Sequence, residues 1–125
     1  MMNNPLALII EDEDDLATIF SIALKTAKFE PEIINDGQVA MQRLTEVVPS
    51  VVVLDLHIPN VPGKKILDYM AETPKFSETH VIIATADARL GDTLRDNATL
   101  VLLKPVSPGQ LRLLAKRLHP NENVD

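Results

Sequence analysis

Short apolar runs alternate with segments of helical periodicity along the whole chain. The apolar runs are typical of buried strands, and in the segments between them apolar residues recur every three or four positions. The strands predicted in this way span residues 6–10, 32–34, 51–56, 80–86 and 99–103. Strands that alternate with helices favour an α/β fold with a mainly parallel sheet, because each helix carries the chain back to where the next strand begins.

The predicted helices carry apolar stripes that would pack on this sheet. The first stripe comprises Leu16, Ile19, Phe20, Ala23, Leu24 and Ala27, and the second comprises Val39, Ala40, Leu44 and Val47. The third comprises Ile66, Leu67 and Met70, and the last comprises Leu111, Leu114, Ala115 and Leu118. Ser107, Pro108 and Gln110 fit a capping box that opens the last helix. Gly91 weakens the pattern of residues 87–97, so a short helix is expected there. Pro31 is expected to end the connection before the second strand.

Length and composition indicate one small acidic domain. The 125 residues suffice for a single domain spanning 1–125, with loose termini expected at 1–5 and 120–125. The net charge of -6 argues against non-specific binding to nucleic acid. The absence of cysteine excludes disulfides and thiolate metal sites. No long apolar run predicts a membrane span, and MMNNP is unlike the start of a signal peptide, so we expect a cytoplasmic protein without membrane contacts.

Polar side chains follow four of the predicted strands. Glu11 and Asp12 follow the first, Asp55 lies in the third, Thr85 lies near the end of the fourth and Lys104 follows the fifth. The carboxyl ends of parallel strands meet at one crevice, so these side chains are expected to converge there. Carboxylates suit a hard divalent cation, while an aspartate, a hydroxyl and an ammonium suit phosphoryl chemistry.

Each of these residues also has a purely structural interpretation. Glu11 and Asp12 could cap a helix, and Asp55 and Thr85 could simply end strands. Lys104 before a proline could be an ordinary surface lysine. Their joint arrangement at the ends of successive strands favours a functional site over these separate explanations.

These residues, in this order and at about this spacing, resemble those of a response-regulator receiver domain, the phosphoacceptor half of two-component signalling. The resemblance covers essentially the whole chain and includes Asp55 within VVVLDLHIPNVPG, Thr85-Ala86 and Lys104-Pro105. It implies a flavodoxin-like, doubly wound, five-stranded parallel sheet. The implied strand order is 2-1-3-4-5, with helices on both faces.

The resemblance also implies a function and a role for each residue. A sensor histidine kinase or histidine phosphotransfer protein would donate a phosphoryl group from phosphohistidine to Asp55. Mg²⁺ would be bound by Asp12, Asp55 and the main-chain carbonyl of His57, with Glu11 acting through a metal-bound water. Thr85 and Lys104 would hold the transferred group. Such a protein catalyses its own phosphorylation and dephosphorylation rather than the turnover of a substrate.

Histidines at three places call for separate interpretation. His80 and His119 lie in unrelated contexts and lack metal-ligand spacing. His57, together with Asp87, would occupy the positions at the rim of the site where receiver domains tune the lifetime of the phosphoryl group. We therefore expect changes at His57 or Asp87 to alter the lifetime of phosphorylated Asp55.

Three departures from the family pattern concern signal output. Val101 stands where the family usually carries a tyrosine or phenylalanine that moves on phosphorylation, and Val106 replaces the phenylalanine after Lys104-Pro105. The interval from Thr85 to Lys104 is also shorter than usual by nearly one helical turn. We infer normal uptake of phosphate but transmission through an atypical surface or mechanism.

Output by protein-protein binding or by phosphotransfer to another carrier is expected if the chain is complete, because 125 residues leave no room for a DNA-binding domain. The downstream target would then be a protein, and the receiver a monomer or weak homodimer. A degenerate receiver that binds partners without phosphorylation is one alternative. A small haloacid-dehalogenase-type phosphatase is another, because Asp12-Glu13-Asp14 mimics its first motif, although Leu16 departs from that motif. EF-hand and nucleotide-binding motifs are incomplete or missing.

Overall fold

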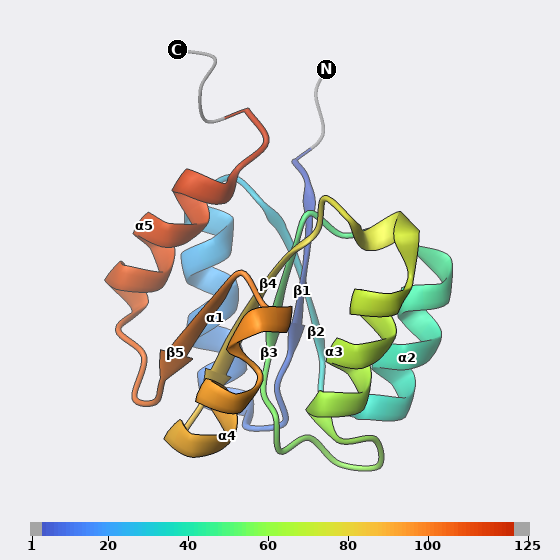
Figure 1. The fold of residues 1–125 in the computed structure, drawn as a ribbon. Coiled ribbons are helices and arrows are strands. Elements are labelled where there is room, and N and C mark those ends of the chain that lie inside the picture. The colour runs from blue at the N-terminus through green and yellow to red at the C-terminus, as the bar shows by residue number, and fades with distance from the viewer. Residues whose placement is uncertain (1–3, 122–125) are drawn as a thin grey trace.

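A five-stranded parallel sheet with helices on both faces forms the protein in a computed structural model that describes residues 4–121 (Figure 1). The strands are β1 (Leu6–Ile10), β2 (Glu30–Ile34), β3 (Val51–Leu54), β4 (His80–Thr85) and β5 (Leu100–Leu103). They lie in the order β2-β1-β3-β4-β5, and every neighbouring pair is parallel. The predicted doubly wound architecture and its strand order are therefore confirmed.

The helices divide between the two faces of the sheet. They are α1 (Asp14–Thr26), α2 (Gly37–Glu46), α3 (Gly63–Glu72), α4 (Ala88–Thr93) and α5 (Pro108–Leu118), with 3₁₀ turns η1 (Pro74–Phe76) and η2 (Arg95–Asn97). α1 and α5 cover one face, while α2 and α3 cover the other (Figure 1). Among residues 4–121, no helix combines the length and apolar character that a membrane crossing requires. The predicted short helix in 87–97 is confirmed as α4 followed by η2.

The central strands are buried on both sides, which explains their continuous apolar runs. In β1, Ala7 and Ile9 pack toward α1 and α5, whereas Leu8 and Ile10 pack toward α2 and α3. Each large aliphatic side chain buried in this way contributes about 1.5–3 kcal/mol. These two apolar layers hold the strands in a fixed register, so the positions of their ends are fixed as well.

Strand boundaries differ from the prediction at several places. β2 begins at Glu30 and includes Pro31, which we had expected to precede the strand. β2 is an edge strand, where a residue without an N–H group is tolerated on the unpaired side. β3 ends at Leu54, two residues earlier than predicted, so Asp55 lies just beyond it. β4 and β5 are each shorter than predicted by one residue.

Two residues assigned to buried stripes are exposed. Ile19 of α1 is 39% exposed and Val39 of α2 is 56% exposed. Helical periodicity identifies the arc that faces the sheet, but neighbouring elements decide how far that arc is covered. The loose termini predicted for 1–5 and 120–125 fall mostly outside the described residues. Within those residues, the Pro5 carbonyl accepts a hydrogen bond from the Glu30 N–H at 2.8 Å.

Side-chain caps fix the starts of three helices. Asp36 accepts hydrogen bonds from the N–H groups of Gln38 and Val39 at the start of α2, and these bonds lower its pKa. Ser107 accepts from the Gln110 N–H, which is half of the predicted capping box. The third cap, Asp87 at the start of α4, lies beside the candidate site.

Gly63 permits the start of α3 to pack directly on the backbone that follows β3. A Cβ atom at this position would lie 2.6 Å from both the Asp55 carbonyl oxygen and the Leu56 Cα. Backbone atoms cannot move aside as a flexible side chain can. α3 therefore supports the segment that carries Asp55.

We predict that Gly63→Ala destabilises the protein by about 1–3 kcal/mol, because the methyl group must displace backbone. Gly109→Ala is the matched control, since its Cβ would lie 3.8 Å from the Ser107 Oγ, an ordinary van der Waals distance. Alanine should then leave stability unchanged or raise it by up to about 1 kcal/mol. Urea unfolding followed by circular dichroism measures both, and equal midpoints would contradict the packing role of Gly63.

Candidate functional site

Every predicted site residue lies at the carboxyl end of the sheet. Glu11 and Asp12 follow β1, Asp55 follows β3, Thr85 is the last residue of β4 and Lys104 follows β5. The structure therefore brings these residues together although they span much of the chain. Parallel strand order is the reason, because all four strands end at the same edge.

Backbone hydrogen bonds continue past the strand ends and fix the site residues. The Asp55 N–H donates to the Ile10 carbonyl at 2.9 Å, and the Glu11 N–H donates to the Ile34 carbonyl at 3.0 Å. The Lys104 N–H donates to the Thr85 carbonyl at 2.8 Å. The site is consequently built on the rigid ladder of the sheet rather than on free loops.

One ammonium group is shared between two buried carboxylates. Lys104 Nζ lies 2.9 Å from Glu11 Oε1 and 3.5 Å from Asp55 Oδ2. Glu11 is 1% exposed and Asp55 is 5% exposed. The orientation at Glu11 Oε1 does not meet hydrogen-bond geometry, so this buried oxygen has an ionic neighbour but no hydrogen bond. It therefore retains capacity for a further positive ligand.

The carboxylates form a cluster suited to a divalent cation. One oxygen each from Glu11, Asp12 and Asp55 lies within 4.8 Å of the others. Three carboxylates and the single ammonium of Lys104 leave a formal surplus of two negative charges. Asp12 is exposed and lines an open hollow together with His57, which gives an ion access from solvent. The donor set is all oxygen, as Mg²⁺ and similar hard cations prefer.

Burial and charge shift two pKa values in this cluster. Burial raises the pKa of Glu11, and repulsion from Asp55 adds to this, while attraction to Lys104 opposes it. Burial disfavours the Lys104 ammonium, but Glu11 and Asp55 outweigh that effect and raise its pKa. The two raised pKa values are consistent with each other, because the site holds more negative charge than one lysine can compensate, which favours protonation of both groups.

Local hydrogen bonds orient the two groups nearest the expected chemistry. The Asp55 Oδ1 accepts a hydrogen bond from the His57 N–H at 3.1 Å. Thr85 is fully buried, and its hydroxyl oxygen accepts from the Asp87 N–H at 3.0 Å. The Thr85 hydroxyl proton is thus available to an anionic oxygen placed beside Asp55.

His57 and Asp87 approach each other at the rim. His57 Nε2 lies 3.7 Å from Asp87 Oδ2, and the His57 side chain is 63% exposed while that of Asp87 is 40% exposed. The Asp87 Oδ1 also accepts a hydrogen bond from the Leu90 N–H and caps α4. The rim contact therefore joins the segment after β3 to the start of α4.

α4 lies against Thr85 and Val101 through a glycine. A Cβ atom on Gly91 would lie 2.9 Å from Val101 Cγ1 and 3.1 Å from Thr85 Cγ2. The sequence indicates Gly91 only as a weak point of the helix, but this glycine permits close packing beside the site. A glycine within a helical pattern is the signal that could have indicated this contact.

Other residues considered in the sequence lie outside the cluster. Asp14, from the dehalogenase-like motif, is the exposed first residue of α1 and does not belong to the group of clustered carboxylates. His119 instead ties α5 to the chain after α1, because it lies 3.1 Å from the Lys28 carbonyl. Val106 is buried in the layer beneath α1 and α5.

Comparison with known proteins gives consistent matches. Residues 7–116 match the family described as the response regulator receiver domain. The regulatory protein AtoC of Escherichia coli is 31% identical over 113 residues, which cover 88% of this chain but 24% of AtoC. The chain thus spans about a quarter of that relative's length.

Solved structures show the same fold. The BeF3-activated DrrB receiver domain has a TM-score of 0.80 and 25% identity, covering 94% of this chain and 97% of that one. The chemotaxis response regulator CheY4 of Vibrio cholerae has a TM-score of 0.82 and 20% identity, covering 93% and 99%.

We predict that the metal-free protein becomes less stable, relative to Glu11→Gln, as pH rises from 4.5 toward neutrality. The folded-state pKa of Glu11 lies above its usual 4.5, so the fold binds more protons than the unfolded chain across that window. Glutamine keeps the side chain neutral throughout. Urea unfolding in the presence of a chelator at several pH values measures the difference. Exposed Glu13→Gln is the control, and a pH-independent gap for Glu11→Gln would contradict the assignment.

Proposed function

The chain belongs to the response regulator receiver domain family, and we propose that it is a phosphoacceptor switch in which Asp55 receives the phosphoryl group. Receiver domains are signalling phosphoacceptors rather than enzymes that turn over a substrate. The observation that carries the proposal is the placement of Lys104 Nζ between buried Glu11 and Asp55. This pairing keeps a cation beside the aspartate that would accept the phosphoryl group.

Mg²⁺ is the proposed cofactor, held by Asp12, Asp55 and the main-chain carbonyl of His57, with Glu11 acting through a metal-bound water. The clustered carboxylate oxygens and the surplus negative charge support this assignment. When bound, the ion supplies positive charge that reduces repulsion between Asp55 and an anionic donor. Asp12 is exposed, so its carboxylate would be accessible to an ion from solvent.

The proposed reaction transfers a phosphoryl group from phosphohistidine to an Asp55 oxygen. The P–N bond breaks, its electron pair stays on the histidine nitrogen, and a P–O bond forms at Asp55. Lys104 and the Thr85 hydroxyl would stabilise the phosphoryl oxygens, over which the transition state spreads its negative charge. The His57 N–H holds the Asp55 carboxylate in a fixed orientation. No general base is needed, because a carboxylate nucleophile has no proton to lose when it attacks phosphorus.

Resetting occurs by hydrolysis of the acyl phosphate. Water attacks phosphorus, the P–O bond to Asp55 breaks, and inorganic phosphate leaves with the carboxylate restored. The same residues would assist both directions, so the protein catalyses its own phosphorylation and dephosphorylation. The His57–Asp87 contact at the rim lies in a position to restrict the approach of this water.

The proposed partners are a sensor histidine kinase or histidine phosphotransfer protein and a downstream protein target in the cytoplasm. The net charge of -6 makes direct DNA binding by this domain unfavourable. We propose a monomer or weak homodimer as the signalling unit.

Signal output is proposed to pass through α4 rather than through a moving aromatic ring. Thr85 would turn toward the phosphoryl group, and its methyl group is a near neighbour of Gly91. Val101 is a near neighbour of the same glycine. A movement of the Thr85 side chain would therefore alter the packing of α4 directly. Asp87, which both contacts His57 and caps α4, offers a second connection.

We predict that the wild-type protein, incubated with Mg²⁺ and a small-molecule phosphodonor, gains one phosphoryl group and that Asp55→Asn gains none. An amide cannot act as the nucleophile, while the fold should persist because the side chain keeps its shape. Intact-mass spectrometry measures the addition. Chelation of the metal should abolish it, and Asp96→Asn, which removes an exposed aspartate elsewhere, should leave it intact.

Other outcomes of this experiment distinguish the alternatives. No addition to the wild type would favour a degenerate receiver that binds partners without phosphorylation. Turnover of a phosphate ester that depends on Asp12 but not on Asp55 would favour a phosphatase. Amide NMR spectra with and without BeF3 test the output, because signals of α4 should shift, and unchanged α4 signals would contradict transmission through this helix.

We predict that His57→Ala and Asp87→Asn each shorten the lifetime of phosphorylated Asp55 by about threefold to tenfold, equivalent to about 1 kcal/mol in the hydrolysis barrier. Asparagine at residue 87 retains the helix cap while removing the charge. Loss of the phosphoryl group is followed by intact mass after removal of the donor. His80→Ala, at the opposite end of β4, is the control. Unchanged lifetimes in both rim variants would refute the restricting role.

A further inference from the structure

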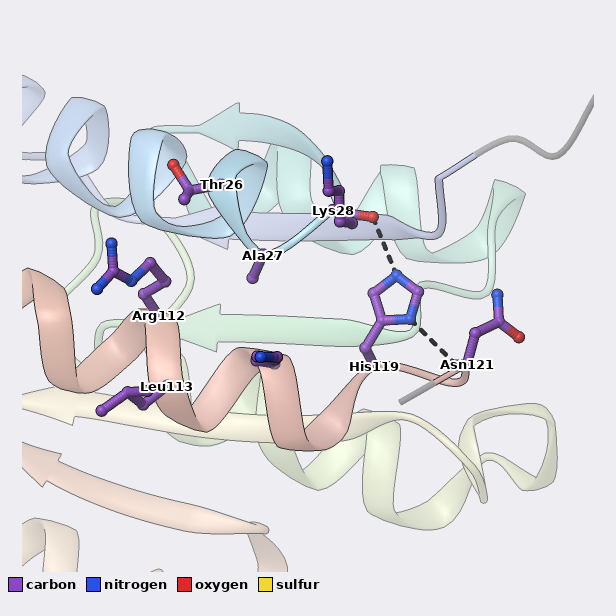
Figure 2. Close-up of a pocket in the computed structure, with 8 residues that line it drawn as sticks. Thr26, Ala27, Lys28, Arg112, Leu113, His119 and Asn121 are labelled. Carbon is purple, nitrogen blue, oxygen red and sulfur yellow. Dashed lines mark hydrogen bonds between the residues drawn. The ribbon is translucent and has the colours of Figure 1, made fainter. Parts of the chain in front are cut away.

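α1 and α5 enclose a groove on the outer face of the molecule. Two adjoining hollows of about 500 and 220 Å³ share Thr26 and Arg112. We call them together the α1–α5 groove, and its principal lining residues are Ile22, Thr26, Lys28, Arg112, Leu113 and Lys116. Figure 2 labels Thr26, Lys28, Arg112 and Leu113 in the larger hollow. The larger hollow lies within the size range of pockets that accommodate ligands.

The larger hollow lies at the end of the sheet opposite Asp55. Lys28 follows α1 just before β2 begins, whereas Asp55 follows the end of β3. The Asn121 N–H donates to His119 Nδ1, so Nε2 carries the proton and donates to the Lys28 carbonyl at 3.1 Å (Figure 2). This bond closes one end of the groove. An occupant could therefore bind without contacting the proposed phosphorylation site.

Large apolar side chains are exposed along the groove. Ile22 is 62% exposed and Leu113 is 60% exposed, and Ile19, at 39%, lines the smaller hollow. Ile19, Ile22 and Thr26 are spaced by three and four residues, so they form one face of α1 that the sheet does not cover. Concentration of apolar side chains in one exposed groove is typical of an interaction surface.

The charge of the groove is opposite to that of the whole chain. Lys28, Arg112 and Lys116 line it, and no carboxylate among the described residues lines either hollow or forms an ion pair with these three cations. The net charge of the chain is -6. The helix dipole favours a cation in the last turn of α5, which could explain the presence of Lys116 there. It does not explain Arg112, which lies near the middle of that helix.

We propose that the α1–α5 groove binds an acidic amphipathic segment of a partner protein. Apolar side chains of the segment would contact Ile22 and Leu113, and its carboxylates would pair with Lys28, Arg112 and Lys116. A second copy of this chain fits less well, because a twofold contact would set these cations against one another. An anionic membrane is disfavoured by the concave surface and by the net negative charge.

The test uses fluorescence anisotropy with a labelled peptide of about 15 residues that carries leucine on one helical face and glutamate on the others. The measurements are made at 0.15 M ionic strength, where the Debye length is about 8 Å, so that the salt screens the peptide from acidic residues outside the groove. Saturable binding to the wild type is expected, with about fivefold to tenfold weaker binding by Lys116→Glu. Leu113→Ser should also weaken it severalfold.

Arg117→Glu is the matched control. Arg117 lies in the same last turn of α5 and is exposed, but it does not line the groove. Reversing the charge of Arg117 should change the peptide affinity by less than about twofold, because an exposed charge outside the contact contributes little to binding. Circular dichroism verifies that each variant is folded. Asp55→Asn should bind the peptide like the wild type, so this inference and the proposed phosphorylation fail independently.

Several results would overturn the proposal. The first is the absence of saturable binding, and the second is equal binding of a peptide with lysine in place of glutamate. The third is an equal loss of peptide affinity in Lys116→Glu and Arg117→Glu. A concentration-dependent dimer that Lys116→Glu disrupts would assign the groove to a second copy instead. Binding to vesicles of anionic lipid that Lys116→Glu abolishes would assign it to a membrane surface.

Discussion

A surplus of buried negative charge at the carboxyl end of the sheet constrains the rest of the site. Glu11 and Asp55 are almost completely buried, and Lys104 is the single ammonium placed between them. Burial of an incompletely compensated charge is unfavourable, which is why the pKa of Glu11 is raised. The metal-free fold tolerates this because two apolar layers hold the strand ends together. A divalent cation would compensate the surplus negative charge.

The residues that set the charge of the site are different from the residue that lies against α4. Glu11, Asp12 and Lys104 set the charge of the site, whereas Thr85 is a close neighbour of Gly91 in α4. α4 is short, so few contacts oppose its displacement. The α1–α5 groove belongs to another part of the molecule, with its larger hollow at the end where the strands begin. One small domain can therefore present a modifiable site and an independent binding surface.

The strands and most helices could be predicted because burial on both faces leaves continuous apolar runs, as in β1 and β3. The predictions were wrong where burial or pairing by neighbouring elements decides whether a residue is covered or belongs to a strand. Ile19 and Val39 fit a helical stripe but remain 39% and 56% exposed, because neighbouring elements cover them only in part. Pro31 suggested a break, yet an edge strand accommodates it. The roles proposed for the site residues came from family resemblance, and their spatial convergence followed from parallel strand order.

Periodicity and the order of the motif residues along the chain were enough to predict the parallel α/β architecture, the family and the residues that follow each strand, because these features are encoded locally. Tertiary structure alone decided that Lys104 Nζ lies between Glu11 and Asp55, that His57 approaches Asp87, and that Gly91 admits α4 to Thr85. It also decided that cations and apolar side chains of α1 and α5 line one groove. These contacts are between residues that are distant in the sequence, and they depend on how side chains and helices pack across the whole sheet.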